Sequence, residues 1–201
     1  MTGLAKQRPV FHSEADFQHA FARALWETAP DVQSRLEVPN RTSSGSEHLD
    51  LLCIGANART AIEFKYWTRS WTGTAGTPTE EYRLRAHAAT DIARRNFVFD
   101  IARLERFGEQ TRQNGIALIL TNESSLWTAP PQRAAQSRDS AFRIHEGSTL
   151  AGTMLWGGGD YPANTRELHG KYDLAWTDYS SQSGAGGTFR YLIVETLPTL
   201  D

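Results

Sequence analysis

The sequence has little of what several protein classes depend on. It contains a single cysteine, Cys53, so no internal disulfide can form, and no Cys/His spacing typical of a zinc site is present. No apolar run approaches the about 20 residues of a transmembrane helix, and no signal peptide is recognisable. The net charge is −2, so no overall positive field attracts nucleic acid. These absences favour a soluble, cytoplasmic protein that does not associate with membranes.

Lysine is also scarce, because Lys6, Lys65 and Lys171 are the only three and every other basic residue is arginine. The planar guanidinium suits phosphate and carboxylate recognition. High-GC coding bias would produce the same composition, and we regard it as the simpler explanation. The sequence shows no phosphate-binding Gly-rich loop, nucleophile elbow or helix-borne histidine pair.

The remaining composition is that of an ordinary globular protein, with 39% hydrophobic and 22% charged residues. A chain of 201 residues is most economically a single domain. The patterning changes along it: residues 12–125 mix helical and strand patterns, whereas residues 140–201 carry short strand patterns. We therefore expect a single domain with an α/β core and a C-terminal β-rich extension packed on that core.

Hydrophobic periodicity predicts the individual elements. Residues 1–11 are expected to be a mobile lead-in, and residues 68–81 a long loop without periodic pattern. Helices are predicted over 13–28, with Ser13 as N-cap, and over 83–107. Strands are predicted over 32–38, 49–54, 60–67, 116–120, 142–145, 150–156, 172–179 and 188–196. Gly184–Gly187 is expected to be the turn between the last two strands.

The central feature of the chain is the hairpin predicted over residues 49–67. Its apolar background is interrupted by Asp50, Glu63 and Lys65. A buried charge is costly unless it is paired or binds a metal, so three charges in one hairpin require a reason. Glu63 and Lys65 are two residues apart and point to the same face of a strand, and strand pairing can bring Asp50 beside them. The pattern predicts two carboxylates and one ammonium converging at one end of a sheet.

Asp50 followed after twelve residues by Glu63-Phe64-Lys65 resembles the signature of the PD-(D/E)XK nuclease superfamily. The predicted order of helix, strand, hairpin, helix and strand also matches this family over residues 14–122. One departure is Leu49, which stands where the family usually has proline. The resemblance implies a restriction-endonuclease-like core, with helices flanking a central mixed β-sheet and extra C-terminal β-strands.

The resemblance also implies a metal-dependent nuclease that hydrolyses phosphodiester bonds, with DNA as the expected substrate and endonuclease rather than exonuclease action. Mg²⁺, with Mn²⁺ as a substitute, prefers oxygen ligands and needs only one or two carboxylates. Asp50, Glu63 and the Phe64 carbonyl are the expected ligands. Lys65 would orient or deprotonate the attacking water, and burial with a neighbouring cation is expected to lower its pKa.

Glu14 is a further catalytic candidate, because many members of this superfamily place a glutamate of the first helix near the metal. Acidic residues in a first turn also occur for purely structural reasons, since they complement the helix dipole. On the second helix, Arg94, Arg95 and Arg103 could contact phosphates, but we interpret most of them as a solvated, salt-bridged face. Tyr66, Trp67 and Trp71 could stack on bases or serve as core residues.

Two other hypotheses remain from the sequence. The chain could be a non-catalytic module of the same fold that binds nucleic acid or protein. It could also be an unrelated protein in which the motif arose by chance. Because the net charge is mildly acidic, a nuclease would need locally clustered basic residues, a metal, a homodimer or a partner protein to hold DNA.

Overall fold

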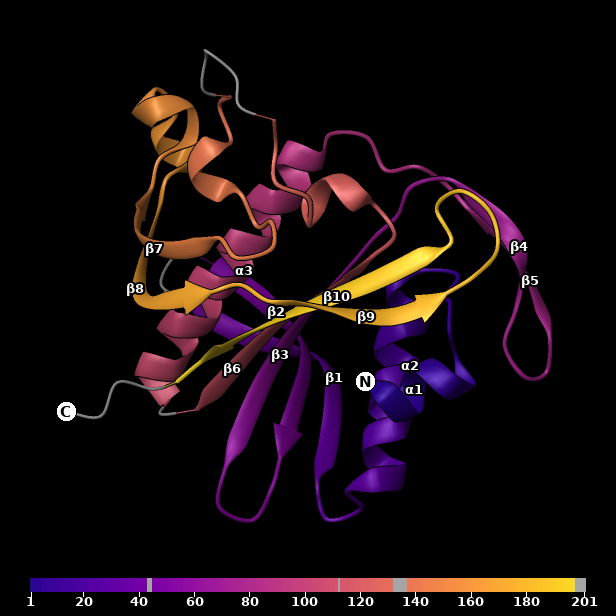
Figure 1. The fold of residues 1–201 in the computed structure, drawn as a ribbon. Helices are drawn as coiled ribbons and strands as arrows, with labels where there is room; N and C mark the ends of the chain where they lie inside the picture. Colours follow the sequence, from indigo (N-terminus) through magenta and orange to yellow (C-terminus); the bar gives the residue numbers. More distant parts are fainter. Residues whose placement is uncertain (43–44, 112, 132–136, 198–201) are drawn as a thin grey trace.

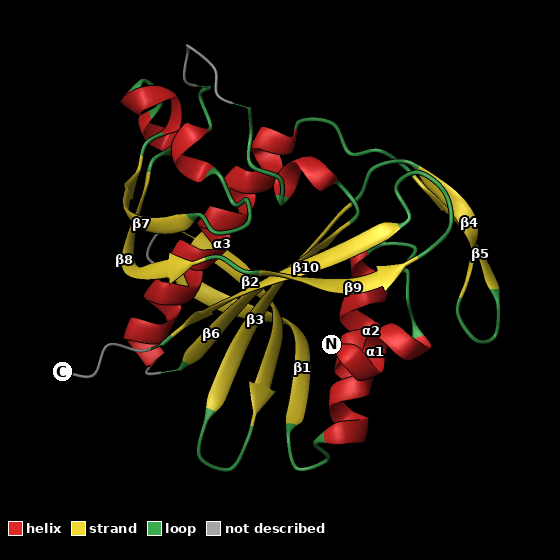
Figure 2. Cartoon of the chain, in the orientation of Figure 1, coloured by secondary structure: helices red, strands yellow, loops and turns green. Residues whose placement is uncertain are grey.

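The computed structural model of the chain describes residues 1–201 apart from 43–44, 112, 132–136 and 198–201. It shows an α+β protein built on a six-stranded mixed sheet with helices on both faces (Figures 1 and 2). The strand order is β1 (Gln33–Thr42), β2 (Gly45–Ile54), β3 (Arg59–Trp67), β6 (Asn114–Thr121), β10 (Thr188–Thr196) and β9 (Trp176–Ser181). The β3–β6 pair is parallel and the other pairs are antiparallel. The expected mixed sheet flanked by helices is confirmed.

Helices cover the two faces of the sheet separately. On one face, α2 (Glu14–Thr28) begins at the predicted N-cap Ser13, and its Phe17 packs against Phe64 of β3. On the other face, α3 (Thr90–Thr111) forms the crossover between β3 and β6. Strands that are covered on both sides are apolar throughout, which explains the continuous run of apolar residues in β6. None of the helices in the described part of the chain has the length and apolar character needed to cross a membrane.

The N-terminal residues are ordered, so the expectation of a mobile lead-in is wrong. Residues Thr2–Gln7 form helix α1, and the following Val10 and Phe11 are completely buried. The Phe11 amide donates a hydrogen bond of 3.3 Å to the Tyr66 hydroxyl, which is 55 residues away in the chain. Residues 1–11 contain too few apolar side chains to show a helical or strand period in the sequence. They are buried because they pack into the core on the face of the sheet that α2 covers.

The predicted loop after β3 is a two-stranded hairpin of β4 (Trp71–Ala75) and β5 (Glu80–Leu84). Its inward side chains, Trp71 and Tyr82, are buried. Because β5 occupies residues that we assigned to the second helix, α3 begins at Thr90 instead of residue 83. Threonine and glycine obscure the alternation of the short strands, which is why the sequence pattern missed them.

The C-terminal third also differs from prediction. The strand expected over 142–145 is wrong, because Phe142 ends a 3₁₀ turn and is buried by Trp156. The strand expected over 172–179 is two strands, β8 (Arg166–Asp173) and β9, and β8 pairs with β7 (Thr149–Met154). Short 3₁₀ helices lie at Ser124–Leu126, Ser140–Phe142, Trp156–Gly159 and Pro162–Asn164.

The last hairpin is as predicted and belongs to the main sheet. The strand β10 has the predicted bounds, and the preceding turn contains Gly184 and Gly186 at positive φ. β10 pairs with β6 from Arg190–Thr121 to Thr196–Gly115, and β9 pairs with its other edge. The β7–β8 hairpin instead packs on α3. The sheet that carries the predicted hairpin is therefore continued by C-terminal strands.

Candidate active site

The candidate site lies where β2 and β3 separate. Their ladder ends at the pair Leu51–Ile62, although β2 continues to pair with β1. Beyond this point, the Phe64 amide donates a 2.7 Å hydrogen bond to the Asp50 carboxylate. The Tyr66 amide donates a 2.7 Å hydrogen bond to the Glu14 carboxylate. Amides two residues apart face the same edge of a strand, so two acidic side chains take the place of the missing neighbouring strand.

Glu63 and Lys65 lie on the same face of β3, as predicted, and point toward α3. There the Glu63 carboxylate accepts a hydrogen bond from Arg103. The Lys65 ammonium lies 2.9 Å from the Asp100 carboxylate, and Arg103 also donates to Asp100 at 2.8 Å. Glu63 is 1% exposed, so its carboxylate is removed from water. Thus α3 contributes one acidic and one basic side chain to the group.

The structure brings together the four residues that the sequence singled out. Electrostatic coupling links Glu14 to Lys65, Asp50 and Asp100, and it links Glu63 to Asp50 as well. The cluster contains four carboxylates, from Glu14, Asp50, Glu63 and Asp100, and two cations, from Lys65 and Arg103. When all six groups are ionised, negative charge therefore exceeds positive charge by two. A divalent cation carries the two positive charges that would balance this excess.

Burial changes the acidity of this cluster. It raises the pKa of Glu63 to about 9, because desolvation and the neighbouring Asp50 and Asp100 outweigh the favourable charge of Arg103. Burial also raises the pKa of Asp100 and of Glu14. The pKa of Lys65 is raised, although desolvation opposes this, because Asp100, Glu14 and Asp50 all favour its charged form. The lowering of the Lys65 pKa that we expect beside a bound metal stays a prediction.

The donor set fits a hard divalent cation. The Oε1 atom of Glu63 is buried and has no hydrogen-bond partner, which is costly unless a cation or water completes it. The Phe64 carbonyl lies at the opening between β2 and β3, where it accepts a 2.9 Å hydrogen bond from Lys65. Within the described residues, no three acidic, histidine or cysteine side chains are arranged to hold a metal by themselves. Because Mg²⁺ keeps several waters, Asp50, Glu63 and this carbonyl are the oxygens that would hold it.

Sequence reasoning missed Asp100 as a site residue, and it considered Arg103 as a phosphate contact without placing it beside Glu63. Asp100 lies beside the apolar stripe of Phe97, Ile101 and Leu104, all of which are fully buried. An acidic residue flanked by core positions is the signal that could have identified it. Arg103 carries no such signal, because its direction depends on how α3 is rotated against β3.

The aromatic candidates and Arg94 pack against other protein groups. Tyr66 and Trp71 are buried in the core on the α2 face, and Trp67 stacks on His87 with ring centroids 4.9 Å apart. The His87 ring also contacts Thr68. Arg94 is only 3% exposed, so the solvated position that we expected for it is wrong.

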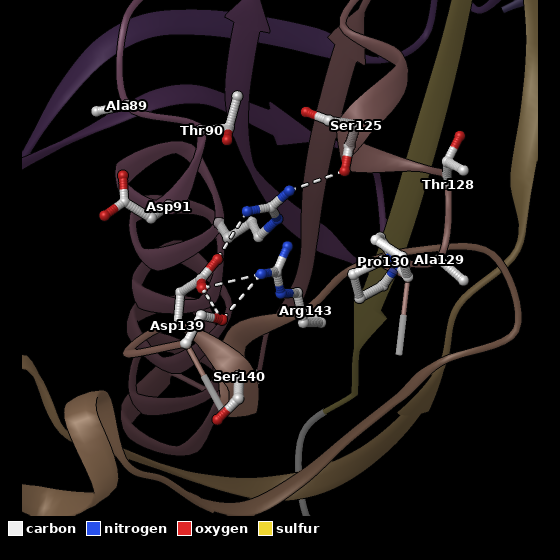
Figure 3. Close-up of a pocket in the computed structure, with 13 residues that line it drawn as sticks. Ala89, Thr90, Asp91, Ser125, Thr128, Ala129, Pro130, Asp139, Ser140 and Arg143 are labelled. Carbon is white, nitrogen blue, oxygen red and sulfur yellow. Dashed lines mark hydrogen bonds and ion pairs between the residues drawn. The ribbon is translucent and has the colours of Figure 1, made fainter. Parts of the chain in front are cut away.

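A pocket lies apart from the acidic cluster, beside the start of α3 (Figure 3). It has a volume of about 780 Å³. Arg94 donates to Asp139 at 2.7 Å and to the Ser125 carbonyl at 2.8 Å, while Arg143 lies 3.2 Å from Asp139. Arg94, Arg143 and Asp139 are therefore already paired with one another. For chemistry we therefore favour the acidic cluster, where four carboxylates meet two cations and the buried Glu63 Oε1 atom has no hydrogen-bond partner.

Comparisons with known proteins leave the family open. No family model matches the chain, and no significant match was found among curated proteins or solved structures.

Proposed function

We propose that the protein is a metal-dependent phosphodiesterase that acts on nucleic acid, with DNA as the favoured substrate. The observation that carries this proposal is the buried cluster at the separation of β2 and β3. It combines the Asp50 and Glu63 carboxylates, the Phe64 carbonyl and the Lys65 ammonium, and the buried Oε1 atom of Glu63 has no hydrogen-bond partner. These are the oxygen donors that Mg²⁺ prefers, beside a cation that can contact a phosphate.

The arrangement of elements supports a restriction-endonuclease-like core. Helix α2, strand β1, the β2–β3 hairpin, helix α3 and strand β6 follow in the order that the PD-(D/E)XK resemblance implies. The crossover through α3 makes β3 and β6 parallel neighbours. Asp50 and Glu63 come from the two strands of the hairpin, as the motif requires.

In this proposal, Asp50, Glu63 and the Phe64 carbonyl hold Mg²⁺ or Mn²⁺, which supplies an acidified water and neutralises phosphate charge when bound. Lys65 stays protonated because of its three acidic neighbours, so it acts as a hydrogen-bond donor to the water or to a phosphate oxygen. Asp100 orients the Lys65 ammonium. Glu14 holds the Tyr66 amide and thereby fixes the end of β3.

Arg103 has two sets of partners available in this scheme. In the metal-free protein it neutralises Glu63 and Asp100. If Glu63 were to bind a cation, the guanidinium would keep Asp100 as a partner and could turn toward the non-bridging oxygens of a phosphodiester, for which its planar fork is suited. Arg103 is therefore the additional residue that we assign to stabilisation of phosphate charge.

The proposal is tested by calorimetric titration of Mg²⁺ and Mn²⁺ into wild type and Asp50→Asn, together with cleavage of closed circular duplex and circular single-stranded DNA. We expect metal binding and nicking in the wild type, and loss of both in the variant. Nicking of closed circles identifies an endonuclease, because an exonuclease has no end to attack. Asp160→Asn, at an exposed aspartate outside the cluster, serves as the matched control.

Absence of metal binding in the wild type would refute the catalytic proposal. The second candidate would then be a non-catalytic module of the same fold that binds nucleic acid or protein, alone, as a homodimer or with a partner protein. Metal binding with cleavage of RNA but not DNA would correct the substrate and leave the mechanism in place.

A further inference from the structure

Three arginines gather near the candidate site, two of them on α3 and the third at the start of β8. The guanidinium carbons of Arg95 and Arg166 lie over the ring of Phe99, at 4.2 and 3.6 Å from its centroid. Both cations share one aromatic ring, so they are close neighbours themselves. Arg106 is near enough to couple electrostatically to Arg166. We call Arg95, Arg106 and Arg166 the arginine cluster.

Among the residues that the structure describes, little negative charge faces this cluster. Arg95 donates to the side-chain oxygens of Asn164 and Asn96, at 2.8 and 3.0 Å. Arg166 donates to backbone carbonyls, and among the described residues neither it nor Arg95 has a carboxylate within ion-pair distance. The sole acidic partner described for the cluster is Glu47, 3.7 Å from Arg106. Like charges held together without counterions favour an anionic ligand.

The pKa of Arg166 supports this description. It is lowered by burial first and then by Arg95 and Arg106, while Glu47 opposes the shift. A bound anion would reverse that effect by stabilising the charged guanidinium. The side chains are also held in place by the aromatic ring and the neutral hydrogen bonds, so little conformational entropy is lost when they bind.

The arginine cluster continues into the candidate site. Residues 95, 99 and 103 follow at intervals of four along α3, so their side chains lie on neighbouring positions of one helix surface. Arg103 reaches Glu63 from this surface. On the other side, Arg106 contacts Glu47, which precedes Asp50 by three residues on β2. The cluster and the carboxylates therefore border the same opening.

We propose that Arg95, Arg106 and Arg166 form a phosphate-binding surface that holds a polynucleotide backbone beside the carboxylate cluster. The inference rests on the proposed function for its substrate and adds the residues that grip it. A repeating phosphate chain is the occupant that fits, because it offers several anions in succession, one for the paired Arg95 and Arg166 guanidinium groups and another for Arg106 further along α3. This locally concentrated positive charge also explains how a chain of net charge −2 could bind nucleic acid.

The test measures binding of a fluorescein-labelled 30-base-pair DNA duplex by anisotropy at several salt concentrations. All proteins carry Asp50→Asn and contain no metal, so that the probe stays intact. We expect Arg95→Gln with Arg166→Gln to weaken binding and to reduce the slope of log affinity against log salt by about 2, since each lost phosphate contact removes about 0.9. Arg95→Lys with Arg166→Lys keeps both charges and should retain most of the slope.

Arg23→Gln is the matched control, because this exposed arginine lies on α2 and pairs with Glu27. It should leave the slope unchanged. A double glutamine variant with the wild-type slope would overturn the proposal, and a lowered melting temperature with that same slope would identify the cluster as a structural clamp only. Binding of poly-L-aspartate as tight as that of DNA, with equal loss in the variant, would also overturn the polynucleotide assignment.

Metal titration and nicking separate the two proposals. Metal-dependent nicking by the protein with Asp50 intact, combined with an unchanged salt slope in the double variant, refutes the arginine cluster alone. A reduced slope without metal binding or nicking refutes the nuclease and retains the polynucleotide surface.

Discussion

At the Glu63 side chain, the cost of burying a carboxylate is opposed by a single ion pair. Its carboxylate is 1% exposed, one oxygen pairs with Arg103, and the other has no hydrogen-bond partner. A residue selected for stability alone would not be a carboxylate here, since desolvation of a charge costs more than one ion pair returns. The arrangement is what a site that accepts a cation requires, because the open oxygen is already in place.

In metal-free solution, we expect Glu63→Gln to raise the melting temperature at neutral and alkaline pH by roughly 2–4 °C, the shift that about 1 kcal/mol produces in a chain of this size. Folding raises the pKa of Glu63 from 4.5 to about 9. The stability that this group contributes is therefore fully present below about pH 4.5 and is lost as pH rises toward about 9. Glutamine cannot ionise, so the variant should lose this part of the decline.

Thermal melts across this pH range, with EDTA and then with Mg²⁺, measure the effect. The exposed Glu81→Gln on β5 is the control and should follow the wild-type profile. Mg²⁺ should stabilise the wild type more than Glu63→Gln. If the melting temperatures of wild type and Glu63→Gln changed with pH in parallel, Glu63 would ionise in the folded protein without loss of stability. That result would contradict the prediction.

At the scale of elements, Glu105 attaches the β7–β8 hairpin to α3. Its carboxylate accepts hydrogen bonds from the His169 and Gly170 amides and a 2.6 Å bond from the Tyr172 hydroxyl. Glu105 is 8% exposed, and its charge raises the pKa of Tyr172 in addition to the effect of burial. The second strand of this hairpin, β8, begins with Arg166, so this attachment also positions the arginine cluster.

We expect Glu105→Ala to lower the free energy of unfolding by roughly 2–3 kcal/mol, because it leaves two amides and a hydroxyl without their acceptor. Tyr172→Phe removes only one of these bonds and should cost about 1 kcal/mol. Urea denaturation measures both values, and amide exchange should accelerate at residues 169 and 170 in the alanine variant. If both substitutions lowered the free energy of unfolding equally, the Tyr172 hydrogen bond alone would account for the stabilising effect of Glu105.

At the scale of the whole molecule, the C-terminal strands complete the sheet that carries the site. β10 lies between β6 and β9, and its Leu192 and Val194 are buried in the core beneath α3. Without β10, the buried strand β6 would become an exposed edge of unpaired amides and carbonyls.

A fragment of residues 1–131 is therefore expected not to fold cooperatively, although it contains every proposed catalytic residue. Circular dichroism melts and the dispersion of amide resonances would show this. Adding a fragment of residues 137–201 should restore structure if strand pairing is the missing element. Cooperative unfolding of the shorter fragment alone would show that the first part of the chain is stable without β10.

Local patterns were sufficient for much of the fold and for the choice of candidate residues. The cap at Ser13, the apolar stripe of α3 and the strand over 188–196 depend on side-chain spacing within one segment, which the sequence displays directly. Asp50, Glu63 and Lys65 were recognisable because a charge in an apolar strand is costly wherever the strand lies. Helix α1 and the β4–β5 hairpin were not recognisable, because their burial comes from distant partners.

By itself, therefore, the sequence determined the order of α2, β1, β2, β3, α3 and β6 and placed three charges in one hairpin. Only the tertiary structure decided which groups surround them. The rotation of α3 directs Asp100 and Arg103 to β3, and the end of the β2–β3 ladder exposes the amides that Asp50 and Glu14 bind. The physical reason is that spacing within a segment reveals which side chains share a face, whereas the partner of that face is chosen by packing between segments.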